Sequence, residues 1–301
     1  MAITVSSDPT VRGLARSRAA AARTLLFLAR RPVLAVGSGV LLVFIGVALL
    51  SPWLAGDPGT INPLRRLKPP SAAQWFGTDH VGRSVFDRTL WGARISLGVG
   101  FAVAIATTVI GVLVGIVAGY FRLADTVIMR AMDAVMAIPA ILLAIALVAL
   151  VGSSPLVIVT AISVPEIPRM ARMVRASVLV LREQAYVEAA ITCGGRLHTI
   201  LLRHILPGAA GPILVQATYV FASAMILEAI LSFLGAGTPP NVPSWGNMMA
   251  EGRQYLQMAP WILGFPALGL ALVVLAVNLL GDVLRDMLDP SLASTGAGRA
   301  R

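Results

Sequence analysis

Lysine is almost missing from this chain of 301 residues, since Lys68 is the only one and Pro69 follows it. A Walker-type phosphate loop, Gly-x-x-x-x-Gly-Lys-Ser/Thr, needs its lysine to reach the β- and γ-phosphates of a nucleotide. The chain contains no such motif. We therefore expect no ATPase site of this kind and predict that the protein is not an enzyme.

Cysteine and histidine are also scarce. Cys193 is the single cysteine, which excludes an intrachain disulfide and a thiolate metal cluster. His80, His198 and His204 show no spacing to carboxylates or thiols that is typical of metal sites. The sequence therefore predicts no metal site and no cofactor bound by this chain.

Charged residues make up 13% of the chain and hydrophobic residues 57%, whereas a soluble domain has about 25% charged residues. This composition excludes an ordinary soluble protein and indicates a membrane protein. The net charge of +10 could suggest nucleic acid as a partner, but no recognition motif accompanies the arginines. We predict contact with membrane lipid and not with nucleic acid.

A helix needs about 20 apolar residues to cross a bilayer. Four uncharged runs meet this length: Val33–Leu54, Ile95–Tyr120, Ile205–Leu227 and Gln254–Gly281. A fifth stretch, Ala134–Val164, is long enough for either one span or two spans that turn at Gly152-Ser153-Ser154-Pro155. Pro139 is expected to break the first of these two helices locally.

The distribution of arginine favours two spans in that stretch. With six spans in total, the cytoplasmic segments hold 17 of the 24 basic residues, as the positive-inside rule requires. The fold class predicted is an all-α polytopic membrane protein with six transmembrane helices and both termini in the cytoplasm. The fourth span then runs from about Pro155 into Pro165-Glu166-Ile167-Pro168.

The predicted organisation has one membrane domain between two tails. Residues 1–32 form a basic cytoplasmic segment, residues 33–290 the six-span domain, and residues 291–301 a cytoplasmic tail. The first apolar run is too long for a signal peptide and suits an uncleaved anchor. Residues 11–31 suit either an amphipathic helix on anionic lipid or, before residue 20, a disordered tail.

Two segments outside the membrane are long. Residues 55–94 form a proline-rich outer loop whose basic cluster, Arg65-Arg66-Lys68, suits either contact with a partner or lipid, or plain solvation. The second, Ser232–Arg253, is predicted to be a structured cap with Trp245 at the membrane interface.

The cytoplasmic loop 169–207 contains a charged insert, Glu188–Pro207, that reads EAAITCGGRLHTILLRHILP. Apolar residues at helical spacing flank Gly194-Gly195, which predicts two short helices joined by a glycine hinge. Pro207 suits the start of the next helix because it lacks an N–H. The pattern indicates a surface that touches another protein.

Four ordered segments resemble one family. They are Glu188-Ala189-Ala190 with Gly194 and Arg203–Pro207; Phe76–Asp79 with Gly82-Arg83 and Gly92–Leu97; Leu231–Gly235 with Pro243–Met248; and Gly281–Pro290. The chain is thereby identified as a member of the ABC importer permeases, in the dipeptide/oligopeptide/nickel branch, and is similar to their C-type subunit.

The resemblance implies a MetI-like permease fold in a bacterial inner membrane. It implies that the loop docks onto an ATPase through Glu188, Ala189, Ala190, Gly194, Gly195, Arg196, Arg203 and Pro207. The partners implied are a homologous B-type permease, two ATP-binding cassette subunits that use ATP and Mg²⁺, and an extracytoplasmic solute-binding protein. Short peptides are the implied substrates, with nickel, glutathione or another small solute as alternatives.

Two further sets of residues lie within the predicted spans. Gly111, Gly115 and Gly119 form a stripe that lets two helices approach closely, either inside this chain or against a sister permease. Glu228, Gln216 and Asn278 are intramembrane polar groups, and such ionisable residues suggest function. Glu228 suits either a structural pairing with the loop after its span or, together with Glu166, ion coupling in a secondary transporter. A membrane anchor without a transport path is the third class that fits.

Overall fold

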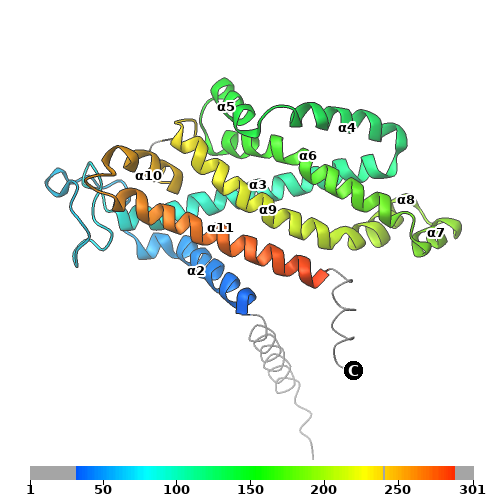
Figure 1. Cartoon of the computed structure of the whole chain (residues 1–301), viewed down its shortest axis with the longest axis horizontal. Coiled ribbons are helices and arrows are strands. Elements are labelled where there is room, and N and C mark those ends of the chain that lie inside the picture. Colours follow the sequence, from blue (N-terminus) through cyan, green and yellow to red (C-terminus); the bar gives the residue numbers. More distant parts are fainter. Residues whose placement is uncertain (1–31, 240, 289–301) are drawn as a thin grey trace, which may run out of the picture.

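The computed structural model describes residues 32–239 and 241–288, which form a bundle of helices (Figure 1). The basic segment 1–32, apart from Pro32, and the tail 291–301 lie outside these residues, as do Asp289 and Pro290. The longer helices are α2 (Pro32–Leu54), α3 (Val85–Tyr120), α4 (Arg122–Met136), α5 (Ala140–Val151), α6 (Pro155–Leu181), α9 (Leu206–Phe233) and α11 (Trp261–Leu288). The shorter helices are α7 (Ala185–Thr192), α8 (Leu197–Ile200) and α10 (Trp245–Gly252).

Four helical runs in the described residues are long and apolar enough to cross a membrane. They are Pro32–Leu54, Val85–Tyr120, Leu197–Phe233 and Trp261–Leu288, and a bent pair, α4 with α5, adds a fifth candidate. The first run agrees closely with the expected span, whereas the last, expected at Gln254–Gly281, begins and ends seven residues later. The third begins well before Ile205, because α8 continues through a π-helical turn at Leu201–Ile205 into α9.

Two expected boundaries are wrong. The segment 55–94 is not a loop throughout, since α3 begins at Val85 and not at Ile95. Ser84 caps this helix, because its hydroxyl accepts a hydrogen bond from the backbone N–H of Asp87. A search for apolar runs does not detect these first turns, because the start of α3 contains charged residues.

The stretch Ala134–Val164 also differs from two straight spans. The chain breaks between Met136 and Ala140, with Pro139 at the start of α5 as expected, and α4 and α5 meet at an angle of 86°. The 12 residues of α5 extend about 18 Å, which is shorter than the hydrocarbon core of about 30 Å. The break expected at Pro139 is therefore present, but it is a sharp bend between two helices, and α5 alone is too short to cross the core. Helix α6 does begin at Pro155, but it continues to Leu181.

The helices place their connections at two opposite ends of the bundle (Figure 1). One end, called the loop end, carries residues 55–84 and α10; the other, called the elbow end, carries α7 and α8. Helices α2 and α9 run toward the loop end, and α3 and α11 run away from it. Consequently, α2 begins and α11 ends on the side away from the loop end.

Helix α3 packs against α6 through its glycine stripe. A Cβ atom added to Gly111 would lie 2.5 Å from Met170, one added to Gly115 would lie 2.6 Å from the Ala171 carbonyl oxygen, and one on Gly119 would lie 2.7 Å from Val178. Only glycine allows the two backbones to come this close. The stripe thus faces a helix of the same chain.

Candidate functional site

Residues 185–207 form a bent helical element at the end of the bundle, called here the elbow. Helix α7 ends at Thr192 and is closed by two hydrogen bonds, from Gly194 N–H to the Ile191 carbonyl and from Gly195 N–H to the Ala190 carbonyl. This pattern is a Schellman motif, which needs a left-handed residue just beyond the cap. Gly194 supplies it with a φ of +76°.

Buried apolar residues fix the elbow to the bundle. Val187 and Ile205 are completely buried and Ile200 nearly so. The site of a Cβ on Gly208 lies 2.9 Å from Leu181, so the start of α9 packs directly on the end of α6. Pro207 stands at the start of α9, directly after the π-helical turn Leu201–Ile205. The elbow is therefore a projection that is anchored to the bundle by buried side chains.

The outer surface of the elbow carries the residues that the family resemblance singled out. Glu188 stands in the first turn of α7, where a carboxylate interacts favourably with the helix dipole. Ala190 is half-buried and helps to seat the helix. The exposed members of the set are Glu188, Ala189, Gly194, Gly195, Arg196, Arg203 and Pro207. This surface combines both signs of charge with exposed apolar side chains at Tyr186, Ile191, Leu197 and Leu202.

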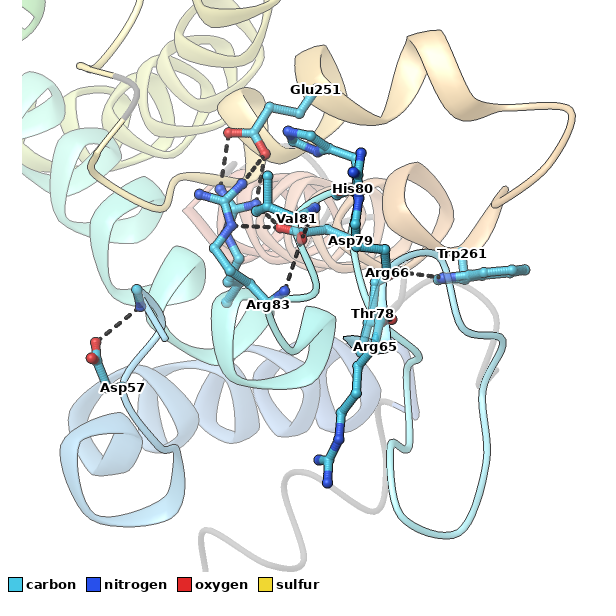
Figure 2. A network of polar contacts seen from close by, with 12 residues as sticks. Asp57, Arg65, Arg66, Thr78, Asp79, His80, Val81, Arg83, Glu251 and Trp261 are labelled. Atoms are coloured by element: carbon cyan, nitrogen blue, oxygen red, sulfur yellow. Dashed lines mark hydrogen bonds and ion pairs between the residues drawn. The ribbon is translucent and has the colours of Figure 1, made fainter. Parts of the chain in front are cut away.

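A second polar site lies at the loop end, where four charged side chains form an ionic cluster (Figure 2). Asp79 accepts hydrogen bonds from Arg83 Nε at 2.6 Å and from Arg88 Nη1 at 2.9 Å. The same two arginines bind Glu251 of α10 at 2.7 and 2.6 Å. The cluster Asp79, Arg83, Arg88 and Glu251 thus ties the loop and α3 to α10.

Burial alone would raise the pKa of Asp79, whose side chain is fully buried. The charge of Arg83, its hydrogen bonds and the charge of Arg88 outweigh burial and hold the pKa below its ordinary value. Asp79 also accepts from the backbone N–H groups of Val81 and Arg83 at 3.0 and 2.9 Å. The carboxylate is thus a fixed anion that orders the turn around it.

The sequence did not predict that Asp79, His80 and Glu251 would come together, each with a ligand atom within 4.8 Å of the others. His80 stacks on Tyr255 with ring centroids 5.2 Å apart. Arg83 and Arg88 already neutralise both carboxylates. A cation at this position would displace those arginines. We therefore interpret the contacts as an ionic cluster and propose no metal centre.

Trp245, expected at the membrane interface, is instead completely buried. Its indole N–H donates to the Thr89 carbonyl at 2.9 Å, and its backbone N–H donates to Ser96 Oγ at 3.1 Å. Cβ atoms added to Gly92 and Gly269 would lie 2.8 and 3.1 Å from the ring. The interfacial prediction is wrong because glycines on α3 and α11 open a pocket for the indole.

Glu228 on α9 is fully buried beneath α10. It accepts hydrogen bonds from Ser232 Oγ at 3.0 Å and Ser96 Oγ at 3.4 Å. Because Ser96 also accepts from Trp245, the carboxyl group belongs to the contact between α3, α9 and α10. Glu228 therefore pairs with its own helix and with α3, whereas the structural alternative placed its partner in the loop after the span.

The other intramembrane polar residues do not join Glu228. Gln216 and Asn278 are both half-buried, on α9 and α11 respectively, and Gln216 lies about 18 Å before Glu228 along the helix. A second buried carboxylate, Glu166, binds Arg169 at 2.9 Å and Ser223 at 3.0 Å. The hydrogen-bond partners of Glu228 are Ser96 and Ser232, and neither Gln216 nor Asn278 is among them.

The fold so far is that of a polytopic, all-helical membrane protein with an exposed elbow at one end. Residues 108–294 match the family model described as "Binding-protein-dependent transport system inner membrane component". The chain belongs to this family of ABC importer permeases, in its dipeptide/oligopeptide branch.

Several relatives extend the match over most of the chain. A probable peptide ABC transporter permease of Sinorhizobium fredii is 50% identical over 261 residues, covering 87% of this chain and 90% of the relative. A dipeptide transport system permease of Alkalihalophilus pseudofirmus is 42% identical, with 86% of each chain covered. A glutathione transport system permease of Pectobacterium atrosepticum is 46% identical over 75% of each chain.

Proposed function

We propose that this chain is a translocation subunit of an ATP-driven importer for dipeptides and oligopeptides in a bacterial inner membrane. The observation that carries the proposal is the elbow, a rigidly seated projection with charged and apolar groups exposed on a membrane bundle. The family membership and the peptide permeases among the relatives support the same function.

The elbow would dock onto an ATPase subunit, with Glu188, Ala189, Gly194, Arg196 and Arg203 at the contact. Its second half continues without interruption into α9, because Leu197–Phe233 is one helical run. When ATP closes the ATPase dimer, a movement of the elbow would therefore act directly on α9 and, through Gly208 and Leu181, on α6. The chain itself would bind no cofactor; ATP and Mg²⁺ would bind to the ATPase subunits.

The topology proposed has six spans with both termini in the cytoplasm. Helix α6 would serve as the fourth span, with its charged second half reaching the cytoplasmic side. The bent α4–α5 pair would form the third. The loop end would then face outward, where α10 and the ionic cluster are placed to meet a solute-binding protein.

The complete importer would contain this chain, a homologous B-type permease, two ATP-binding cassette subunits and an extracytoplasmic solute-binding protein. The glutathione permease among the relatives keeps glutathione as an alternative solute, and nickel or another small solute is the other alternative within this family. An ion-coupled secondary transporter is the alternative from another class.

The test is purification of the tagged chain from its native membrane in mild detergent, followed by mass spectrometry and by measurement of ATP hydrolysis. We expect a second permease and ATPases with Walker motifs, and a binding protein that retains short peptides. Recovery of the chain without any ATPase, in a preparation where a known ABC importer stays intact, would contradict the proposal.

A further inference from the structure

One face in the middle of α9 carries three polar side chains. Gln216, Tyr219 and Ser223 stand three and four residues apart, so they share one face. All three are half-buried. Polar groups inside a membrane bundle face a partner or water rather than lipid, because exposure to hydrocarbon is costly.

Charged residues of two neighbouring helices line up along this face. Near its middle, Ser223 donates to Glu166 of α6, which also binds Arg169, a residue whose side chain is 51% exposed. About 6 Å away along the helix, the Tyr219 hydroxyl donates to Asp282 of α11 at 2.7 Å.

The same face is hollowed. A groove of about 440 Å³ lies between α6, α9 and α11, with Gln216, Tyr219 and Arg285 in its wall. Its volume falls within the range of about 300–1,000 Å³ that is usual for small-molecule sites.

The opposite side of α9 gives the contrast. Leu214, two residues before Gln216, is 55% exposed and lines a groove whose walls are nearly all apolar, with Leu41 and Phe101. The groove beside Gln216 therefore has polar groups in its wall that the groove beside Leu214 nearly lacks.

We propose that the strip formed by Arg169, Gln216, Tyr219, Ser223, Asp282 and Arg285 lines the aqueous translocation path and guides a zwitterionic solute. The inference rests on the proposed function, since a free peptide carries one ammonium and one carboxylate. The second permease would close the other side of the path.

The charges of the strip explain why it suits such a solute. Arg169 and Arg285 can attract a carboxylate, and Asp282 can attract an ammonium group. Together with Glu166 the four charges cancel, so the strip has no excess charge to trap a mobile ion. A zwitterion can exchange its own charges for the existing pairs along the path.

Cysteine substitutions test the strip, because Cys193 is the only native cysteine of this chain and the label is read by mass spectrometry on this chain alone. The complete importer is prepared with Cys193→Ala, and Ser223→Cys, Gln216→Cys and Leu214→Cys are introduced separately. Each is treated with a water-soluble cationic methanethiosulfonate. Because the thiolate forms in water and not in apolar surroundings, we expect Ser223→Cys and Gln216→Cys to react at least about tenfold faster than Leu214→Cys.

Modification of Ser223→Cys should also block ATP-driven uptake of the tripeptide Ala-Ala-Ala into proteoliposomes. Equal reaction rates at the three positions would overturn the proposal, and so would rapid modification that leaves uptake unchanged. If the unmodified importer hydrolyses ATP but does not take up the tripeptide, the peptide assignment fails; the labelling rates still decide whether the strip is aqueous.

A charge change tests the choice of solute. Asp282→Asn leaves the strip with one positive charge in excess, and it should lower uptake of Ala-Lys-Ala relative to Ala-Asp-Ala several-fold. Asp57→Asn removes the same charge from an exposed position outside the strip and is the matched control. If Asp282→Asn leaves the ratio of Ala-Lys-Ala uptake to Ala-Asp-Ala uptake unchanged, the strip does not discriminate solutes by charge.

Discussion

Arg88 of α3 binds Glu251 of α10 through two hydrogen bonds, at 2.6 and 3.1 Å, although 163 residues separate them in the sequence. Arg88 is also almost fully buried beside Asp79.

Arg88→Met would leave the buried charge of Asp79 paired with Arg83 alone. Loss of one partner of a buried ion pair costs about 3–5 kcal/mol, so we expect a clearly lower Tm in detergent. The exposed Arg65→Met is the control, with a change within about 0.5 kcal/mol. Equal melting of the two variants would contradict the role of the cluster.

The ionic cluster also predicts a pH dependence. Because the pKa of Asp79 is lowered in the folded protein, its ionisation stabilises the fold above the unfolded pKa of about 3.9 and loses this effect as the pH falls through the folded value. The Tm difference between the native chain and Asp79→Asn should therefore stay constant from about pH 8 to pH 5 and shrink below about pH 4. A difference that already disappears near pH 6 would contradict the lowered pKa.

Gly194 offers a test of the elbow that does not disturb its packing. A Cβ atom at this position would meet no atom within 4 Å, so the only obstacle is the φ of +76°. Gly194→Leu should strain the turn by about 1–2 kcal/mol and reduce the ATPase that co-purifies with the inserted chain. Gly194→Asn, which tolerates the left-handed conformation, should retain it. Normal ATPase recovery and transport with Gly194→Leu would count against docking through the elbow.

The glycine stripe of α3 can be tested with one substitution at two sites. Gly115→Ala places a Cβ 2.6 Å from the Ala171 carbonyl oxygen, whereas Gly98→Ala on the same helix meets nothing within 4 Å. We expect Gly115→Ala to destabilise the bundle by about 1–3 kcal/mol through overpacking. Gly98→Ala should instead stabilise it by up to about 1 kcal/mol. Thermal unfolding of the two variants side by side gives the answer, and the same sign for both would refute the close α3–α6 contact.

Glu228→Gln separates an ATP-driven importer from an ion-coupled transporter. The glutamine carbonyl can still accept from Ser232 and Ser96, but the side chain can no longer carry a proton in exchange. ATP-driven uptake in proteoliposomes should keep most of its rate. A complete loss in this variant, with normal assembly of the complex, would support proton coupling through this residue.

The elbow could be predicted largely from the sequence because its signals are local. Gly194, Gly195 and Pro207 fix backbone geometry within a few residues of themselves, and the structure places the hinge and the start of α9 there. The apolar run Val33–Leu54 likewise determined α2, since burial in a bilayer requires uninterrupted apolar length. The run Gln254–Gly281 gave the presence of α11 but not its bounds.

The course of the chain between residues 121 and 181 could not be predicted in the same way. Helices α4 and α5 are bent by 86°, and α4 lies on α6 through the pairs Arg172–Asp133 and Arg175–Asp125. Such pairs depend on residues distant in sequence, which a count of apolar residues does not detect.

By itself, the sequence determined the helical membrane class, the elbow and the absence of a Walker motif, because composition and neighbouring residues control these properties. Only the tertiary structure decided that the glycine stripe faces α6, that Trp245 is buried and that Asp79 meets Glu251. It also decided that Glu166 and Asp282 lie along one polar face of α9. Each of these depends on which helices become neighbours, and that choice is made by packing across the whole bundle.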